Sequence, residues 1–233
     1  MLLGEEALLL LRGARVVVAG VGGVGAYAAE MLARCGVGSM ALVDSDTVGE
    51  SNINRQLPAL HSTLGLPKVE VLRDRFLDIN PSIKVECVRE YLTEENIPTV
   101  LDALRPDCVL DAIDTLSPKI ALIQYCLKKG LPLVSSMGSG AKLDVTRIRI
   151  ADISRTRMCP LAHMLRKRLH KLGITEGFTA VYSEEPPRRE STTLEESRNK
   201  KSQVGSVSYL PAAFGCACAQ AVICGIAGIK GNY

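Results

Sequence analysis

The sequence predicts an α/β protein with a doubly wound, mostly parallel sheet. Residues 15–20 (RVVVAG) are a β-branched run ending in glycine, followed directly by a glycine turn (VGGVG) and an Ala-rich, helix-favouring stretch. Residues 39–44 (SMALVD) form a second strand-like run, so the first 44 residues have the pattern of a strand–helix–strand unit. Aromatic residues make up only 4% and glycines number 20, which suits closely packed sheet and helices. Together these observations indicate a Rossmann-like fold.

The other elements follow from hydrophobic periodicity and from Gly and Pro breaks. We expect helices over residues 26–34, 68–79, 118–129, from 160 onward, and 210–229. Strands are expected over residues 84–88, 107–114, 131–136, 146–150 and 178–183. The strands of the C-terminal half are expected to extend the sheet in antiparallel fashion.

Charge is unevenly distributed along the chain. The 28 basic and 25 acidic residues give a net charge of only +3, which does not indicate a nucleic-acid binder overall. Residues 154–173, however, contain six Lys or Arg and no acid. On a helix from Pro160 the leucines 161, 165, 169 and 172 share one stripe and the cations lie opposite. This segment is either an RNA-binding surface or an ordinary solvated helix face; its candidate RNA contacts are Arg155, Arg157, Arg166, Lys167 and Lys171.

Two further segments differ from the rest of the chain. Residues 184–203 contain one apolar residue, Leu194, so we expect a mobile loop over 184–205, with Arg188 and Arg189 as weaker RNA contacts. Residues 204–229 carry no charge, and their Ala, Gly and Cys content favours a buried or dimer-interface helix over a membrane span. The eight cysteines lie in apolar runs and are expected to be reduced thiols in a cytoplasmic protein.

The glycine turn has the spacing of a nucleotide-binding site. Gly20, Gly22 and Gly25 match G-x-G-x-x-G between a strand and a helix, where phosphate oxygens can approach the N–H groups of the helix N-terminus. Asp44 lies 19 residues after Gly25, at the end of the second strand, where a carboxylate can bind the ribose hydroxyls. The glycines and Asp44 therefore predict a bound nucleotide.

The residues outside the glycine turn favour ATP over a dinucleotide. Asp46, Asn52, Arg55 and Gln56 follow Asp44, and Lys68 and Asp114 come later. Hydride transfer requires none of these groups, whereas splitting ATP requires cations on the phosphates and a carboxylate on Mg²⁺.

These motifs resemble the ubiquitin-activating-like superfamily of adenylating enzymes, which includes ThiF and MoeB. The resemblance implies that Asp44 binds the ribose, that Asn52, Arg55 and Lys68 bind phosphates, and that Asp114 binds Mg²⁺. Arg55, Lys68 and Asp114 are then the catalytic candidates. The full set implied for ATP is Gly20, Gly22, Gly23, Gly25, Asp44, Asp46, Asn52, Arg55, Gln56, Lys68 and Asp114. Residues 1–140 correspond to the ThiF-type ATP-binding region, and residues 141–233 to the C-terminal part of the same domain.

Within this superfamily the chain resembles the tRNA threonylcarbamoyladenosine dehydratases. The similarity is clearest in LLGEEAL, GVGGVG, NINRQ, LPKVE, DAIDT and CPLA. It implies a tRNA substrate whose threonine carboxylate is adenylated and then cyclised, a homodimer, and a monovalent cation as a further ligand. The sequence has no Cys-x-x-Cys pair, so we expect no zinc and no ubiquitin-like protein as substrate.

Two departures from the family pattern leave alternatives open. The family's arginine before LLGEEAL has no counterpart because the chain begins at Met1, so we expect either a truncated start or impaired ATP handling. Ser206 stands near the position of a cysteine linked to sulfur-transfer partners, which argues against such a partner. Cys159 is interpreted as a packed cap residue rather than a reactive thiol. The alternatives to the dehydratase are an adenylyltransferase for a sulfur-carrier protein and a non-catalytic nucleotide-binding subunit.

Overall fold

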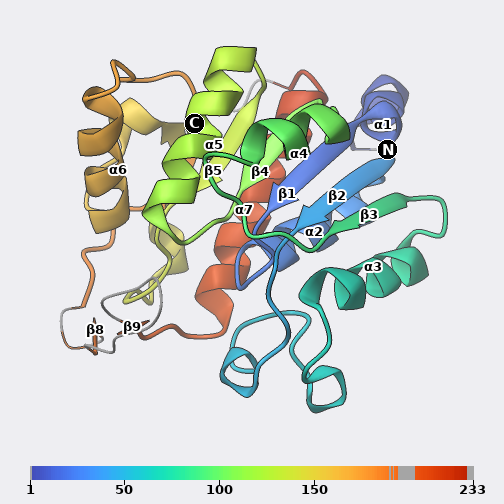
Figure 1. Ribbon diagram of the computed structural model, residues 1–233, viewed down its shortest axis with the longest axis horizontal. Helices are drawn as coiled ribbons and strands as arrows, with labels where there is room; N and C mark the ends of the chain where they lie inside the picture. Colours follow the sequence, from blue (N-terminus) through green and yellow to red (C-terminus); the bar gives the residue numbers. More distant parts are fainter. Residues whose placement is uncertain (1, 189, 191, 194–202, 230–233) are drawn as a thin grey trace.

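The chain folds around a central sheet with helices on both faces (Figure 1). The computed structural model describes residues 2–188, 190, 192–193 and 203–229. Within them, a seven-stranded sheet has the order β3-β2-β1-β4-β5-β7-β6. Its strands are β1 (Arg15–Ala19), β2 (Ser39–Val43), β3 (Lys84–Val88), β4 (Cys108–Asp111), β5 (Leu133–Ser136), β6 (Ile148–Asp152) and β7 (Thr179–Ser183). All neighbours pair in parallel except β6 and β7, which confirms the predicted α/β fold and limits its antiparallel part to one pair.

The helices form two layers, one on each face of the sheet. One apolar core joins the sheet to α1 (Gly4–Gly13), α2 (Gly25–Arg34), α3 (Lys68–Ile79) and α7 (Tyr209–Ile226). The other core joins it to α4 (Ile97–Leu104), α5 (Leu116–Lys129) and α6 (Pro160–His170). Short 3-10 turns complete the connections: Glu50–Asn52, His61–Thr63, Val145–Arg147 and Ile153–Arg155.

The strand order reverses between β1 and β4, which places a crevice at the carboxyl ends of these two strands. Ala19, the last residue of β1, pairs with Val43 of β2 and with Asp111 of β4. The turns after β1, β2 and β4 therefore begin side by side, and they carry most of the residues predicted to bind ATP.

Several element boundaries differ from the expectation. Strand β4 ends at Asp111 rather than at residue 114, because the Asp111 carboxylate accepts a hydrogen bond from Ile113 N (3.0 Å) and turns the chain away from the sheet. Strand β6 starts two residues later than expected, after a 3-10 turn capped by Asp144, whose carboxylate accepts from Thr146 N. The helices α1 and α4 had not been expected.

The uncharged C-terminal run forms α7, which packs against the sheet and α2. Leu210, Phe214 and Cys218 are fully buried there. At Gly215, a Cβ would lie 2.7 Å from Val24 O, so the absence of a side chain allows α7 to approach α2 closely. Among the described residues α7 is long and apolar enough to cross a membrane, and half of its residues are buried inside the fold. Packing in the core accounts for its composition.

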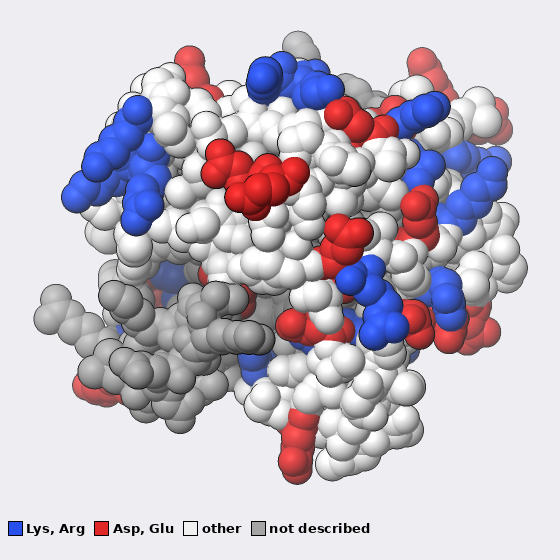
Figure 2. Space-filling view, in the orientation of Figure 1, with Lys and Arg blue, Asp and Glu red and all other residues white. Residues whose placement is uncertain are grey.

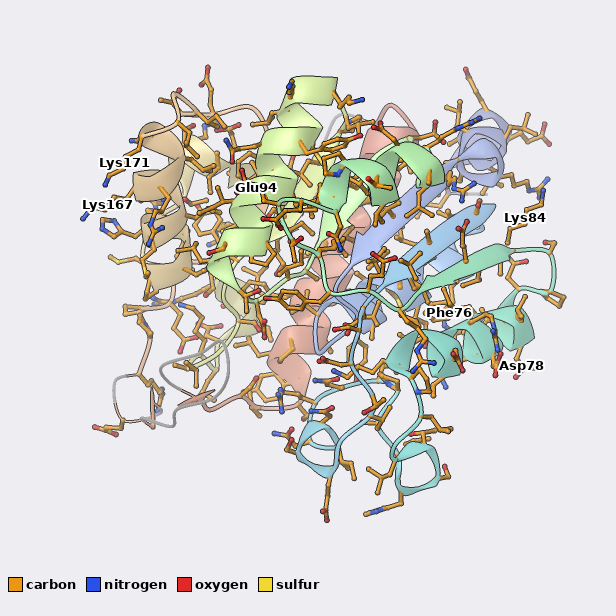
Figure 3. All side chains as sticks on the ribbon, in the orientation of Figure 1. Phe76, Asp78, Lys84, Glu94, Lys167 and Lys171 are labelled. Carbon is orange, nitrogen blue, oxygen red and sulfur yellow. The ribbon has the colours of Figure 1, made fainter. Side chains whose placement is uncertain are left out.

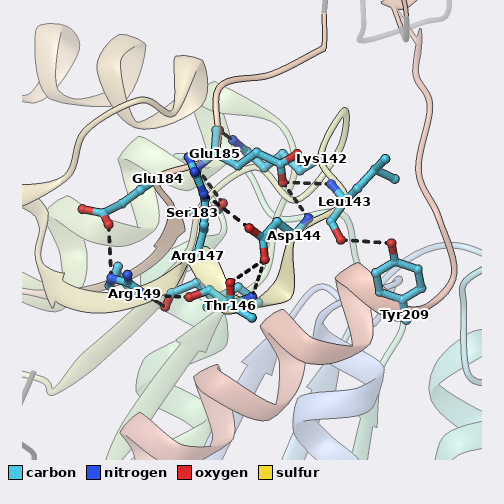
Figure 4. A network of polar contacts seen from close by, with 11 residues as sticks. Lys142, Leu143, Asp144, Thr146, Arg147, Arg149, Ser183, Glu184, Glu185 and Tyr209 are labelled. Carbon is cyan, nitrogen blue, oxygen red and sulfur yellow. Dashed lines mark hydrogen bonds and ion pairs between the residues drawn. The ribbon is translucent and has the colours of Figure 1, made fainter.

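The beginning of the expected mobile loop is held by hydrogen bonds (Figure 4). The Glu185 carboxylate accepts from Leu143 N and Asp144 N, both at 2.8 Å, and Lys142 Nζ donates to Glu185 O. Farther along, β8 (Thr192–Thr193) and β9 (Gln203–Val204) pair in antiparallel fashion. Residues 189, 191 and 194–202, and with them Arg189, lie outside the described residues. The mobility of the loop stays a prediction.

Candidate nucleotide site

The glycine turn after β1 lies directly against the loop that follows β4. Gly20 has φ +85°, and a Cβ there would lie 2.9 Å from the carbonyl oxygen of Ala112. A side chain at Gly20 would therefore be strained and would push apart the two walls of the crevice. At Gly25 a Cβ would lie 1.9 Å from Gly20 O, so this glycine is required for the tight turn into α2. The turn exposes backbone at the N-terminus of α2, where an anion is favoured.

Asp44 closes the turn from the β2 side. Its Oδ2 accepts from Val21 N (2.8 Å), and its Oδ1 accepts from Asp46 N (2.9 Å). Burial raises the pKa of Asp44, although the two backbone hydrogen bonds and Lys68 oppose this shift. The carboxylate is thereby fixed beside the glycine turn, where the sequence placed the ribose ligand.

Lys68 stands at the N-terminus of α3, and its side chain reaches Asp46, two residues after Asp44. Its side chain is only 5% exposed, and its Nζ lies 2.8 Å from Asp46 Oδ2. Asp46 is 66% exposed, so this pair joins a buried cation to a carboxylate that faces solvent. The backbone supports the arrangement, because Lys68 N donates to Asp46 O (3.1 Å). The structure therefore brings together Asp44, Asp46 and Lys68.

The segment after β2 folds back over the glycine turn. A Cβ at Gly23 would lie 3.6 Å from Arg55 Cγ, and one at Gly22 would lie 3.7 Å from Gln56 Nε2. Arg55 is held by its own segment, since its Nη1 donates to Ser51 O (2.9 Å) and Asn54 Oδ1 (2.8 Å). Gln56 Oε1 is buried and has no hydrogen-bond partner among the described residues. Arg55 and Gln56 thus lie beside the turn, as the sequence predicts.

Asn52 holds this segment in shape. Its Oδ1 accepts from Gly49 N (3.1 Å), and its carbonyl oxygen accepts from Arg55 N and Gln56 N (3.1 and 2.9 Å). In this structure the Asn52 side chain therefore shapes the backbone that presents Arg55. Its predicted role at the phosphates stays a prediction.

Asp114 is exposed in the loop between β4 and α5. The backbone of this loop contacts the glycine turn through Ala112, so Asp114 belongs to the same crevice as Gly20. No group of three or more His, Cys, Asp or Glu side chains suited to a metal occurs in the described part of the chain. A metal here would need ligands from a bound molecule in addition to Asp114.

The cationic residues of α6, with Lys171 directly after its last residue, form a surface patch that we call the α6 patch (Figures 2 and 3). Lys167 and Lys171 point away from the fold at the edge of the molecule in Figure 3, and blue side chains gather at the same place in Figure 2. Arg166 differs, because it is half-buried and its Nη1 donates to Thr156 O (2.6 Å). The expected leucine stripe is wrong at Leu172, which is 49% exposed; Ala162 is buried with Leu165 and Leu169 instead.

Arg155 and Arg157 lie beside the edge strand β6. With Arg149 they line a cavity of ≈ 570 Å³. Arg157 and Arg149 both pair with Glu184, and Arg157 holds the pKa of that carboxyl below its usual range. Of the predicted RNA contacts, Arg155 and Arg157 thus line this cavity, whereas Lys167 and Lys171 are not among its lining residues.

The cysteines are free thiols. Burial raises the pKa of Cys108, Cys126 and Cys218 to about 12, which keeps these thiols protonated at neutral pH. Cys159 is 3% exposed at the start of α6, and this burial fits a packing role.

One pair of charged residues at this site was missed from the sequence. Lys119 and Asp111 are both fully buried beneath the loop that carries Asp114, with Nζ 2.7 Å from Oδ2. Lys119 shares the buried face of α5 with Leu122, Ile123 and Cys126. A lysine at a core position of an apolar helix face was the available signal, since a buried lysine needs a partner.

The candidate site lies where the strand order reverses, between β1 and β4. It combines the glycine turn with two carboxylates, Asp44 and Asp114, and two cations, Arg55 and Lys68. They define a Rossmann-like nucleotide-binding protein. The chain belongs to the ThiF family, whose model matches residues 1–233.

Within the ThiF family, the chain is similar to proteins named as tRNA threonylcarbamoyladenosine dehydratases. The chain is 48% identical over 185 residues to the tRNA threonylcarbamoyladenosine dehydratase of Bacillus subtilis, covering 79% of this chain and 72% of that protein. It is 44% identical over 168 residues to the dehydratase of Escherichia coli, covering 72% of this chain and 62% of that protein, which is less than two thirds of its length. The crystal structure of E. coli TcdA in complex with ATP matches with a TM-score of 0.89 at 35% identity, covering 97% of this chain and 91% of that chain.

Proposed function

We propose that this chain catalyses the ATP-dependent dehydration of N6-threonylcarbamoyladenosine in tRNA. The observation that carries the proposal is the match over almost the whole chain to an ATP-bound dehydratase of this name. The residues expected at ATP support it, because Asp44, Arg55 and the Asp114 loop border the glycine turn and Lys68 pairs with Asp46 beside Asp44.

The proposed chemistry has two steps. An oxygen of the threonine carboxylate attacks the α-phosphorus of ATP, which forms an acyl-adenylate and releases pyrophosphate. A nucleophilic atom of the same side chain then attacks the acyl carbon, and AMP leaves with the former carboxylate oxygen. The nucleoside has lost one water. Because the second attack is intramolecular, orienting the side chain contributes most of what the protein must supply.

The residues at the crevice have distinct parts in the first step. Lys68 and Arg55 place positive charge where negative charge develops on the phosphates, and the low exposure of Lys68 strengthens its effect. Asp44 holds the ribose. The second step requires no protein nucleophile.

Mg²⁺ fits the donor set at the crevice. Mg²⁺ is usually bound by one or two carboxylates together with substrate phosphates, so a single exposed acid beside a phosphate-binding turn is sufficient. Asp114 would hold the ion, which would neutralise phosphate charge in the adenylation step. Because Gly20 has no Cβ, the loop that carries Asp114 can lie directly against the glycine turn.

The substrate surface proposed for tRNA is the α6 patch, where Lys167 and Lys171 are exposed. Cationic side chains on one helix face can contact successive phosphates without reading sequence. The proposal also includes that the chain forms a homodimer and acts in the cytoplasm.

The test is to incubate the protein with ATP, Mg²⁺ and tRNA that carries threonylcarbamoyladenosine, and to measure the digested nucleosides by mass spectrometry. We expect a nucleoside lighter by one water, which disappears in Asp114→Ala and persists in the surface variant Lys84→Ala. Adenylation of a ubiquitin-like sulfur-carrier protein without this product would favour the adenylyltransferase instead. ATP binding with neither product would favour a non-catalytic subunit.

A further inference from the structure

Asp111 and Lys119 form an ion pair that solvent does not reach. Both side chains are 0% exposed, and Lys119 Nζ lies 2.7 Å from Asp111 Oδ2. The same oxygen accepts from Ser135 Oγ at 2.7 Å. Two side chains with no exposed surface are enclosed by the fold, so their effect on a bound nucleotide must pass through other residues.

The pair forms hydrogen bonds with both backbone polar groups of Ile113, its N–H and its carbonyl oxygen. Asp111 Oδ1 accepts from Ile113 N at 3.0 Å, and Lys119 Nζ donates to Ile113 O at 3.0 Å. The carbonyl of Ile113 belongs to the peptide bond that leads into Asp114. Fixing this peptide plane therefore restricts the backbone from which the Asp114 side chain projects.

The same loop also forms one wall of the glycine turn. Ala112 N donates to Ala19 O (2.8 Å), and the Cβ position of Gly20 lies 2.9 Å from Ala112 O. A shift of the loop would thus move Asp114 relative to the phosphate-binding backbone.

Stability alone does not explain a buried ion pair at this place. Replacing such a pair by apolar groups of similar size is often neutral or stabilising, because the free energy of desolvating two charges offsets most of the free energy of their attraction. The hydrogen bonds of this pair are directed to a single loop residue beside the predicted metal ligand.

We propose that Asp111 and Lys119 are positioning residues that fix the Ile113–Asp114 peptide and so direct the Asp114 carboxylate toward Mg²⁺ and the ATP phosphates. The inference depends on the proposed function only for the role given to Asp114. Ser135 supports the pair by holding Asp111 from β5.

The central variant is Asp111→Asn combined with Lys119→Met, which removes both charges and avoids leaving one buried alone. The Asn oxygen can still accept from Ile113 N, but Ile113 O loses its donor. The matched control is Lys129→Met on the same helix, where Lys129 pairs with Asp102 in an exposed position (2.9 Å).

The first readout is amide hydrogen exchange of the 111–116 peptide in protein free of metal and nucleotide. We expect about tenfold faster exchange in the double variant, because a loop that loses hydrogen bonds opens locally more often. The second is ATP binding titrated with Mg²⁺. We expect the Mg²⁺ concentration for half-maximal binding to rise about tenfold, as when groups that orient a metal ligand are removed, while ATP binding without Mg²⁺ stays unchanged.

Unchanged exchange and an unchanged Mg²⁺ requirement in a folded double variant would overturn the proposal. If the double variant does not fold, Ser135→Ala tests the proposal instead. It removes one hydrogen bond to Asp111 and should also raise the Mg²⁺ concentration for half-maximal ATP binding. Asp114→Ala with a wild-type Mg²⁺ requirement would overturn the premise. None of these assays uses tRNA, so a failure of the dehydration reaction would be recognised separately.

Discussion

Lys68 Nζ lies 2.8 Å from Asp46 Oδ2, and the lysine is buried while the carboxylate is exposed. A buried ammonium with one solvent-facing partner is poised to exchange that partner for a phosphate oxygen. We expect Lys68→Met to weaken ATP binding by about 10- to 100-fold, the effect of losing a hydrogen bond to a charged group. Isothermal titration with ATP measures it. Lys84→Met, which removes an exposed lysine of β3, should leave the affinity unchanged; equal losses in both variants would contradict a local role for Lys68.

The raised pKa of Asp44 makes nucleotide binding sensitive to acid. Burial disfavours its charged form, so the carboxylate becomes protonated at a pH above its ordinary value of 3.8. If the ribose hydroxyls require the ionised form, ATP affinity should fall as pH decreases through this raised pKa, and Asp44→Asn should show a weak affinity with little dependence on pH. Titrations between pH 7 and the onset of acid unfolding test this. A midpoint at or below 3.8 would contradict it.

Gly20 and Gly36 provide a matched pair for separating backbone strain from close contact. Both have φ +85°, but a Cβ at Gly36 would meet nothing within 4 Å, whereas one at Gly20 would meet Ala112 O at 2.9 Å. We expect Gly36→Ala to lower the free energy of unfolding by about 1 kcal/mol. Gly20→Ala should cost about 2–4 kcal/mol, because overpacking adds to the strain, and should abolish ATP binding. Urea unfolding measures the difference, and equal costs would show that the crevice tolerates a methyl group.

The glycine turn and Asp44 could be placed from the sequence because they lie at fixed distances from recognisable strand ends, whereas Asn52, Arg55, Lys68 and Asp114 were given their roles by the resemblance to adenylating enzymes. The glycine spacing places Gly20 and Gly25, and the Pro67-Lys68 helix start places Lys68. These signals are local in the chain, and parallel pairing then aligns the strand ends.

The missed features depend on contacts between distant segments. Asp111 stops β4 through its own side chain, and Lys119 lies eight residues farther on, so their pairing is visible only after α5 packs on the sheet. The helix α4 did carry a local signal, since Ile97, Val100, Leu101 and Leu104 have helical spacing and are all buried. Leu172 was assigned to the wrong face because α6 ends at His170 and the chain turns before reaching it.

Glu30 anchors α2 to α3 and should make the fold sensitive to acid. Its side chain is 7% exposed and pairs with Arg34 (2.9 Å) and Arg75 (2.6 Å). Burial alone would raise the pKa of Glu30, but the two arginines outweigh it and the pKa is lowered from 4.5. A lowered pKa stabilises the fold fully above pH 4.5, and this stabilisation is lost as pH falls through the lowered value.

Glu30→Gln should therefore lower the free energy of unfolding by about 1–2 kcal/mol at pH 7. The difference from wild type should shrink as pH falls below 4.5. Denaturant unfolding at several pH values measures both. Glu86→Gln, which breaks the more exposed pair with Arg15, serves as control and should cost less at pH 7. A Glu30→Gln deficit that is constant with pH would rule out the ion pairs as its cause.

The two kinds of cation on α6 should respond differently to mutation. Lys167 and Lys171 are exposed, so replacing either by alanine should leave stability unchanged and weaken tRNA binding. Each lost phosphate contact should also reduce the slope of log affinity against log salt by about 0.7–0.9. Arg166 donates to Thr156 O, so Arg166→Ala should mainly lower the melting temperature and should change tRNA affinity less. Filter binding of tRNA at several salt concentrations, beside thermal unfolding, separates the two effects. An unchanged salt slope in the double variant Lys167→Ala/Lys171→Ala would contradict tRNA binding at α6. It would favour the cavity at β6 that Arg149, Arg155 and Arg157 line.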